Sequence, residues 1–432
     1  MLLSCPGLSQ AQAVNALAEN AIFQIDAGGS LRLRYEWKRN FSLAVPASVN
    51  PQDYLLSQLR LHVRVRYKDR WSIYLEGQDA RVNRALLNNT VNDRKSANTF
   101  ADAFDLHQGF VDVNLFDINM GETYGGRLRI GRQKFNLGAQ RMLASLEWVN
   151  TARVWDAIRY TQFLGASKRK VDVWASRLVA VRPHGFNHHG RSGNRMFDSR
   201  FYGIYFSDAE SIRQTHIETY YLQRDNQHVG DRTHTFGLRL AWQGELWDAD
   251  GEAMGQTGSF AFLTHRAYAL HAGAGRKIGD TVHISMAYNT GSGDKNSADT
   301  RHQTFDNLYP LNHAYYGYMD FFSLQNMRNA EAVLRWHANE NSMFRLAYQG
   351  FWLAQAGSDA WYNAGGGVVR NVANPSSAYV GSEIDATLST KIKQWSVNFL
   401  LGYSHFFAGG YVRSSSPSAD ADFIFLQSKW QF

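Results

Sequence analysis

Hydrophobic and polar residues alternate along most of this chain. In residues 31–38 every odd position is apolar and every even position is charged, and residues 59–67 repeat the same arrangement. The end of the chain shows the alternation again, with Ile424, Leu426, Ser428, Trp430 and Phe432 on one face and Gln427, Lys429 and Gln431 on the other. A period of two residues predicts β-strands that have one apolar and one polar face.

The same pattern recurs to the end of the chain, and we count about eighteen strands. The segments are 31–38, 59–67, 71–78, 110–115, 127–130, 154–162, 170–179, 200–207, 215–223, 234–242, 247–256, 266–276, 281–289, 329–337, 343–353, 380–390, 395–404 and 422–432. A soluble sandwich would turn the charged faces to solvent. A barrel in lipid would turn them to the lumen. The regular strands at both chain ends favour the barrel, because a first and a last strand that pair leave no open edge.

Composition agrees with an all-β transmembrane antiparallel β-barrel. No run of about eighteen apolar residues occurs, which excludes membrane-spanning helices. Aromatic residues make up 14% of the chain and often lie near predicted strand ends, as the girdles of such barrels do. Only seven prolines occur, and several fall between the predicted strands. Barrel strands alternate, so a barrel is compatible with the mean hydropathy of −0.39.

We divide the chain into a signal-peptide remnant at residues 1–13 and a barrel with long extracellular loops at residues 14–432. Ala11 and Ala13 fit a small-residue cleavage site, although the basic start of a signal is missing. Cys5 is the only cysteine, so there is no disulfide framework. A signal followed by a barrel implies the outer membrane of a Gram-negative bacterium. The segments 80–103, 181–198, 290–325 and 355–378 are long enough for extracellular loops or plugs of the lumen.

The inward faces of the predicted strands carry a surplus of arginine. The chain has 45 Lys and Arg against 38 Asp and Glu. We expect the pore-lining and substrate-binding residues to be Arg32, Arg34, Arg60, Arg64, Arg66, Arg127, Arg129, Arg132, Arg159, Arg239, Asp248, Asp250, Glu383 and Asp385. Guanidinium groups raise the local concentration of anions and match the geometry of carboxylates. The alternative is a general transverse field, with a basic wall facing an acidic wall and no particular substrate.

Three stretches of the chain resemble the alginate export family of outer-membrane barrels. They are Leu128–Gln133 with Leu146–Arg159; Gly291–Asp294 with Thr304–Pro310, His313, Gly317 and Leu324–Asn326; and Trp361–Gly367 with Val380–Asp385. The resemblance implies a monomeric eighteen-stranded barrel that passes a polyanionic exopolysaccharide outward through a basic constriction, with Arg129 and Arg132 in that constriction. The chain departs from the alginate exporters because residues 308–322 contain no arginine and residues 397–402 contain no basic residue.

Two functions therefore remain open. The first is a channel that exports an anionic, alginate-like exopolysaccharide. The second is a substrate-selective uptake porin for small anionic or sugar-like solutes. The expected partners are an anionic polysaccharide, outer-membrane lipid and lipopolysaccharide, and a periplasmic scaffold of a secretion complex, but no nucleic acid. We predict no enzymatic activity, no cofactor and no metal site. Residues 294–299 offer oxygen ligands but lack the glycine and final glutamate of a calcium loop.

Overall fold

The computed structural model describes residues 22–41, 43, 52–83, 99–115, 125–164, 169–182, 185–189, 196–415 and 419–432. The signal segment predicted at residues 1–13 lies outside these ranges, as does Cys5. Among the described residues, no helix is long and apolar enough to cross a membrane.

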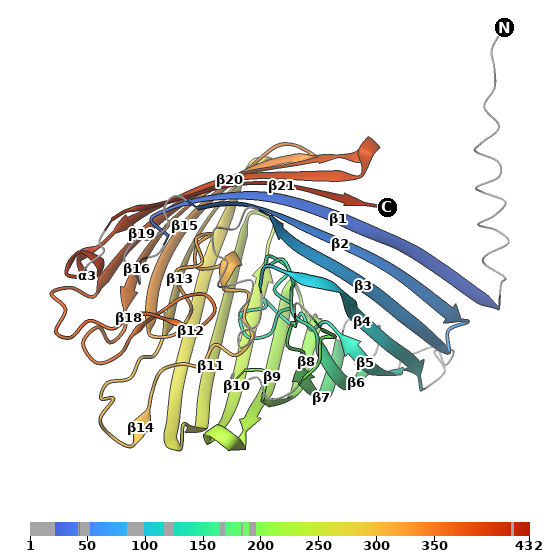
Figure 1. Cartoon of the computed structure of the whole chain (residues 1–432), viewed down its shortest axis with the longest axis horizontal. Coiled ribbons are helices and arrows are strands. Elements are labelled where there is room, and N and C mark those ends of the chain that lie inside the picture. The colour runs from blue at the N-terminus through green and yellow to red at the C-terminus, as the bar shows by residue number, and fades with distance from the viewer. Residues whose placement is uncertain are drawn as a thin grey trace, which may run out of the picture.

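The chain forms a closed antiparallel barrel of 18 strands, as the alternation predicts. The strands are β1 (Phe23–Arg39), β2 (Gln52–Tyr67), β3 (Trp71–Asn83), β4 (Asp102–Asn114), β5 (Gly126–Gln133), β6 (Trp155–Leu164), β7 (Arg169–Leu178), β8 (Arg200–Ile212), β9 (Thr215–Asn226), β10 (Asp231–Gln243), β11 (Trp247–Phe260), β12 (Leu263–Ile278), β13 (Val282–Gly291), β15 (Met327–Asn339), β16 (Ser342–Leu353), β19 (Tyr379–Ile392), β20 (Val397–Ala408) and β21 (Ala421–Gln431). Figure 1 shows them side by side in chain order.

The remaining elements are short and belong to the connections. β14 (Arg301–His302) pairs with β12 in parallel, and β17 (Trp361–Tyr362) forms a hairpin with β18 (Val368–Arg370). The 3-10 helices are η1 (Gln227–Val229), η2 (Asn312–Ala314) and η3 (Lys393–Trp395), and α3 (Gly410–Arg413) is a single helical turn.

The first and last strands close the barrel. β1 pairs with β21 in a continuous antiparallel register from Ser30 opposite Gln431 to Arg39 opposite Asp422. Beyond the strand, the Phe432 amide donates to the Gly29 carbonyl at 3.1 Å, and the Gly29 amide donates to the Phe432 carbonyl at 2.6 Å. Since every barrel strand has two neighbours, the sheet leaves no edge exposed to lipid.

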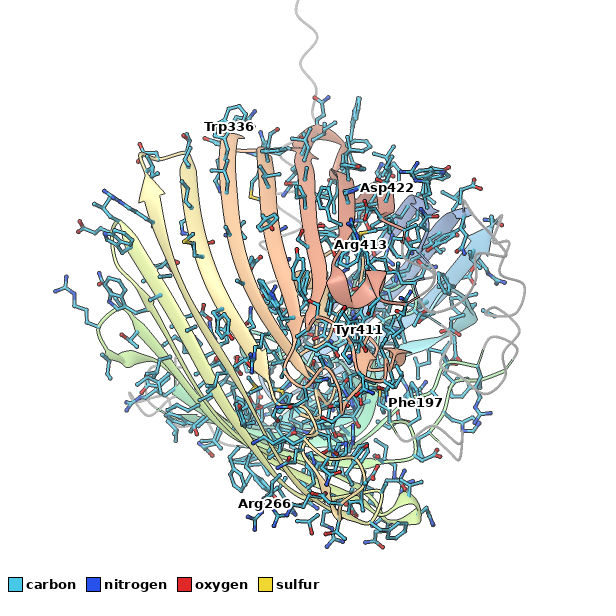
Figure 2. All side chains as sticks on the ribbon, turned by 90° about the vertical axis from the view of Figure 1, so that its left-hand side faces the viewer. Phe197, Arg266, Trp336, Tyr411, Arg413 and Asp422 are labelled. Carbon is cyan, nitrogen blue, oxygen red and sulfur yellow. The ribbon has the colours of Figure 1, made fainter. Side chains whose placement is uncertain are left out.

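The connections at the two ends of the barrel differ in length. Where β1 begins and β21 ends, the turns are short, as at residues 213–214, 244–246, 279–281 and 340–341. At the opposite end lie the long connections, among them residues 134–154, 292–326 and 354–378. Barrels of this kind have short periplasmic turns and long extracellular loops, which orients the molecule. Figure 2 shows Trp336 at the periplasmic end and Arg266 at the extracellular end.

The apolar face of each strand points outward, and the charged face points into the lumen. Leu61 and Leu240 are 45% and 46% exposed on the outer surface, whereas Arg60 is 5% exposed. Val63 is also exposed, and Leu31, Leu33 and Trp430 are half-buried on the same outward face. The lipid-facing assignment of these residues thus agrees with the structure.

Several strands are longer than predicted. β4 begins at Asp102 rather than near residue 110, and its pairing with β3 is interrupted by two register shifts. Such bulges place an extra residue in one strand and break the period-two pattern, so this part of the strand carries no clear sequence signal.

Candidate functional site: a lumen crossed by two loops

Two extracellular connections fold into the lumen and pair with each other. Loop 134–154 joins β5 to β6, and loop 292–326 joins β13 to β15. Tyr309 donates its amide to the Met142 carbonyl at 3.1 Å and accepts from the Ala144 amide at 2.8 Å. The Leu311 amide donates to the Gln140 carbonyl at 2.9 Å. We call the pair the constriction loops, because together they cross the barrel interior.

Aromatic packing holds the constriction loops together. Tyr309 is fully buried and packs edge-on against Trp155 and Phe201 of the wall, with ring centroids 5.7 and 4.9 Å apart. Trp148 of the first loop stacks on His313 of the second at 3.8 Å. Buried aromatic pairs are worth about 0.5–1.5 kcal/mol beyond their burial, so the loops form a packed unit.

Three of the predicted lumen arginines anchor loop 134–154. Arg32 donates from Nη1 to the Glu147 carbonyl at 2.7 Å and from Nη2 to the Val149 carbonyl at 3.1 Å. Arg34 donates to the Trp148 carbonyl at 2.7 Å and lies over that indole ring at 3.9 Å. Both arginines, with Arg60, are at most 5% exposed. These side chains do face inward, but the loop covers them, so they do not line an open pore.

Arg60 makes the charged contact to the same loop. Its Nη1 donates to Glu147 Oε2 at 2.6 Å, and Lys134 Nζ lies 2.9 Å from Glu147 Oε1. Burial alone would raise the pKa of the Glu147 carboxyl, but the charges of Arg60 and Lys134 outweigh it and hold that pKa well below its usual range. The loop thus inserts its own carboxylate between two cations of the wall.

Asn150 fixes the loop through its side-chain amide. Its Nδ2 lies within hydrogen-bonding distance of the carbonyls of Ser57 (3.0 Å), Arg81 (3.1 Å) and Phe100 (2.8 Å), and its Oδ1 accepts from Arg32. The residue is 1% exposed. Because buried polar groups are costly to leave unpaired, this residue ties the loop to β2 and β3.

Arg141 binds the same loop to another part of the barrel wall. Its Nη1 donates to Glu252 at 3.0 Å and to Asp250 at 3.5 Å, both on β11. The guanidinium also lies 4.5 Å from the centre of the Tyr315 ring of the second loop. Loop 134–154 is therefore pinned to two separate stretches of the barrel.

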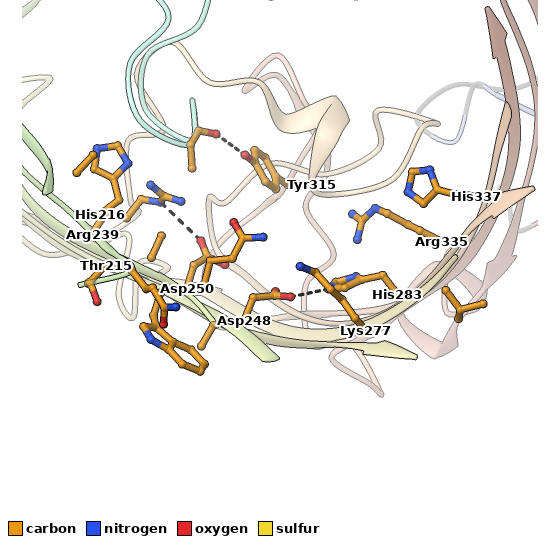
Figure 3. Close-up of a pocket in the computed structure, with 18 of the residues that line it drawn as sticks. Thr215, His216, Arg239, Asp248, Asp250, Lys277, His283, Tyr315, Arg335 and His337 are labelled. Atoms are coloured by element: carbon orange, nitrogen blue, oxygen red, sulfur yellow. Dashed lines mark hydrogen bonds and ion pairs between the residues drawn. The ribbon is translucent and has the colours of Figure 1, made fainter. Parts of the chain in front are cut away.

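A cavity of about 1030 Å³ lies on the periplasmic side of the constriction loops. Figure 3 shows Lys277, His283, Arg335 and His337 on one side of it, Arg239 and His216 on the other, and Tyr315 entering from the loop. Asp248 accepts from His283 at 2.6 Å, and Asp250 lies 3.6 Å from Arg239. Four basic residues line the cavity, Arg141, Arg239, Lys277 and Arg335, against the three carboxylates of Asp248, Asp250 and Asp280. Among the described residues, no ion pair is found for Lys277, Arg335 or Asp280.

The strand register places basic residues in two rows near the periplasmic end of the lumen. One row runs from β2 to β6 and contains Arg66, Arg129 and Arg159, with Ser72 and Asp112 between Arg66 and Arg129. The other runs from β12 to β16 and consists of Lys277, His283, Arg335 and Arg345. Strands nine positions apart face each other in a closed barrel of eighteen, so the rows lie on roughly opposite walls.

Neighbouring carboxylates only partly neutralise the rows. Asp112 accepts a bidentate pair of hydrogen bonds from Arg129 at 2.7 and 2.8 Å, and Asp172 accepts from Arg159 at 2.9 Å. Glu331 accepts from Arg345 at 3.1 Å. Arg345 also faces Arg335 directly, and like charges placed opposite each other destabilise a sheet. The cations on both walls argue against a basic wall facing an acidic one.

Two predicted acids do not line a passage. Glu383 and Asp385 are fully buried; Glu383 accepts from the Met319 amide of the second loop, and Asp385 accepts from Ser404. The sequence predicted their inward direction correctly, but the loop above them closes off the lumen. Glu383 therefore anchors loop 292–326, whereas Asp385 is hydrogen-bonded within the wall.

Arg132 occupies a different position from the one predicted. It lies three residues after Arg129, so strand alternation puts it in the outward row with Ile130. There it binds Asp156 and the carbonyls of Leu106 and Asn187. It is held in the wall rather than in the lumen.

The other predicted arginines face the lumen. Arg64 lies over the ring of Tyr74 at 4.8 Å, and Arg127 lies over Phe163 at 5.7 Å. Arg239 donates to Glu218 at 2.7 Å and lines the periplasmic cavity. Together with Arg66, Arg129 and Arg159, these residues remain candidates for contact with a solute.

A second cavity, of about 660 Å³, lies on the extracellular side of the constriction loops. Its lining is mainly apolar and aromatic, with Phe41, Phe100, Trp148 and Phe321 among the residues. Arg153 and Asp320 are the charged residues of the described lining. The two cavities thus offer different chemistry to a solute.

Sequence reasoning missed the residues of the constriction and of the second basic row. Glu147, Trp148 and Asn150 belong to a stretch that carries the family resemblance, but that stretch gives no sign of which wall it binds. Lys277, His283 and Arg345 occupy inward positions of predicted strands, so alternation could have found them. Segment 290–325 is one of the four segments that the sequence offered as extracellular loops or plugs, whereas segment 134–154 is not among them.

Comparison with known proteins gives one family and one fold. The family model described as alginate export matches residues 23–425. No curated protein matches the chain. Solved structures with a similar fold include the outer membrane protein opdK of Pseudomonas aeruginosa, with 10% identity over 94% of this chain and 98% of that one and a TM-score of 0.63. OccK8 (OprE) of the same organism has 12% identity, the same coverages and a TM-score of 0.62.

Proposed function

The chain belongs to the alginate export family and is a channel of the Gram-negative outer membrane, and from this premise we propose that it selects small carboxylate-bearing solutes. The observation that carries this proposal is the division of the lumen by the constriction loops into cavities of about 1030 and 660 Å³. Pockets of about 300–1,000 Å³ suit small molecules. A polymer strand could pass through the barrel only if the constriction loops moved out of the lumen.

The charge of the periplasmic cavity supports an anionic solute. Lys277 and Arg335 face this cavity, and the row of Arg66, Arg129 and Arg159 lies on the other wall. Guanidinium groups bind carboxylates through paired hydrogen bonds. Cations on both walls raise the local concentration of an anion without holding it at one point, which favours passage over trapping.

The extracellular cavity adds a preference for a ring or another apolar face. Trp148 and Arg153 both line this cavity, so an aromatic surface and a cation border the same space. A sugar acid has both features that this lining accepts: a ring face and a carboxylate. We therefore place small sugar acids first among the candidate solutes.

Glu147 suggests how a solute would open the path. Its carboxylate already occupies the site between Arg60 and Lys134. A solute carboxylate that binds these cations competes with Glu147 and weakens the hold of the wall on loop 134–154. Any such opening can shift the equilibrium only by the difference in affinity between the two states.

Export of an anionic exopolysaccharide is the second candidate, and the family match favours it. In this case both constriction loops would have to swing out of the lumen, and a periplasmic scaffold would deliver the polymer. Export of a polyanion would be expected to need basic residues along the whole lumen. The aromatic extracellular cavity argues against this, because its described lining contains a single arginine.

Flux into proteoliposomes separates the two functions. We expect sodium glucuronate to enter several times faster than glucose at low salt, while an alginate chain of about fifty sugars stays outside. Equal rates for glucuronate and glucose would contradict selection by charge. Passage of the long chain at a rate comparable to glucuronate would favour polymer export instead.

A further inference from the structure

Two arginines stand side by side on the outer surface of the barrel. Arg177 of β7 and Arg200 of β8 are direct cross-strand partners, and both are exposed. Their sequence neighbours Leu178 and Phe201 are fully buried on the lumen side, so the arginines point away from the lumen. Within the described part of the chain, neither guanidinium group makes a hydrogen bond or an ion pair.

These arginines border a cavity of about 380 Å³ outside the lumen. His189 and His228 also line it, as do Asp198 and Asp225. Asp225 accepts from Arg232 at 3.1 Å, so part of its charge is already compensated. Arg200 lies opposite Asp225 in the register of β8 and β9. The cavity is therefore bounded by two arginines that form no ion pair among the described residues, by two carboxylates and by imidazoles that can donate hydrogen bonds.

The cavity lies at the extracellular end, beyond the apolar band of the wall. On the same outward face, Val173 and Ile204 form an exposed cross-strand pair four residues nearer the membrane centre, which is roughly 13 Å along the strands. Arg266 lies two residues beyond the exposed Tyr268 on β12, and Figure 2 shows it at this same end. Basic residues just outside an aromatic and apolar band stand at the level of lipid headgroups.

We propose that Arg177 and Arg200 bind a phosphate of the lipid A headgroup of lipopolysaccharide in the outer leaflet. Like charges placed opposite each other on a sheet repel, and a shared phosphate between them removes that repulsion. The planar guanidinium groups match phosphate oxygens in a bidentate manner. The site is separate from the lumen, so it does not depend on which solute the channel passes.

Binding to the detergent-solubilised barrel tests this site. Native mass spectrometry with a lipid A that carries both phosphates should show a bound lipid. The double variant Arg177→Gln/Arg200→Gln should bind it at least tenfold more weakly. Arg276→Gln is the matched control, because Arg276 is an exposed outward arginine at the periplasmic end of β12. It should bind lipid A as the wild type does.

Two further arms identify the ligand and guard against a folding defect. Arg177→Lys/Arg200→Lys keeps both charges and should retain most of the binding. Lipid A without its phosphates should bind as weakly as the double glutamine variant. Unchanged binding by that double variant, or equal binding of phosphate-free lipid, would overturn the proposal. Inorganic phosphate at millimolar concentration that saturates the site would show a free-anion site instead, and would also overturn it.

Discussion

Glu147 shows how single residues hold the constriction in place. The Glu147 side chain is 42% exposed, yet both of its oxygens contact cations, Arg60 at 2.6 Å and Lys134 at 2.9 Å. Around it, Arg32 and Arg34 bind the loop backbone. The lumen charges therefore bind the loop, and in the proposed opening the same charges would become available to a solute.

Acid should loosen this contact. The neighbouring cations keep the pKa of Glu147 below the value of about 4.3 of a free glutamate. A lowered pKa means that the stabilisation is complete above that value and is lost as the pH falls below about 4. We expect the open probability in planar bilayers to rise as the pH is lowered from 6 to 3. Glu147→Gln should be more open at pH 6 and lack most of this acid response.

A matched control is available on the periplasmic side. Glu340 is 88% exposed in the turn between β15 and β16, and its contact with Lys393 is 3.7 Å. Glu340→Gln should behave as the wild type at every pH. An unchanged acid response in Glu147→Gln would mean that another group controls the loop.

Asn150→Ala tests the neutral anchor of the same loop. The substitution removes the part-buried hydrogen bonds to the carbonyls of Ser57 and Arg81 and the acceptor of Arg32, at a cost of about 1–3 kcal/mol. Since the loss falls on the loop and not on the strand ladder, we expect longer and more frequent openings with little change in the melting temperature of the barrel. Asn341→Ala, in a periplasmic turn, is the control. A lower melting temperature with normal gating would contradict the assignment.

At the residue scale, the sequence predicted which way the arginine side chains point but not what covers them. Alternation correctly turned Arg32, Arg34 and Arg60 inward, because side-chain direction depends only on the strand period. It could not reveal that a loop 87 to 118 residues away in sequence covers them, since that contact depends on tertiary packing. Arg132 could have been excluded, because an odd spacing from Arg129 puts it on the other face.

At the scale of the elements, accessibility to thiol reagents tests both the alternation and the covering loop. Single cysteines at positions 61 and 63 should react with a membrane-restricted reagent, and cysteines at 64 and 66 with a charged, water-soluble one. A cysteine at position 60 should stay protected beneath loop 134–154 and become reactive in the Asn150→Ala background. Reaction at position 60 without that change would show that the loop does not cover the wall.

The seam between β1 and β21 is the other element to test. Phe432 exchanges two backbone hydrogen bonds with Gly29, and a side chain at Gly29 would meet the Arg60 carbonyl and the Phe432 ring. Deleting Phe432 removes both bonds at the closing strand. We expect a several-fold loss of heat-modifiable, membrane-inserted protein, while Gln431→Asn should insert normally. Full insertion of the deletion variant would contradict this role of the seam.

The strands themselves were largely predictable, and the loops were not. β10 and β12 follow the alternation closely, so their existence and direction could be read from the sequence. The bulges of β4 and the pairing of loop 134–154 with loop 292–326 have no periodic pattern. Their geometry follows from buried aromatic contacts and from the arginines of the wall.

At the scale of the whole molecule, the barrel combines cations on both walls with a constriction above them. Arg66, Arg129 and Arg159 face Lys277, Arg335 and Arg345 across the lumen, and the nearby carboxylates compensate them only in part. Such an arrangement makes anion selection depend on ionic strength, because the Debye length falls from about 10 Å at 0.1 M to 3 Å at 1 M salt.

The reversal potential under a gradient of sodium glucuronate tests the central claim most directly. In planar bilayers at about 0.1 M salt, the wild-type channel should pass glucuronate in preference to sodium, and the preference should shrink toward 1 M. Arg66→Gln/Arg129→Gln/Lys277→Gln/Arg335→Gln should shift the reversal potential toward that of a cation-selective channel. A wild-type channel that prefers sodium, or a quadruple variant that keeps the full anion preference, would contradict the account.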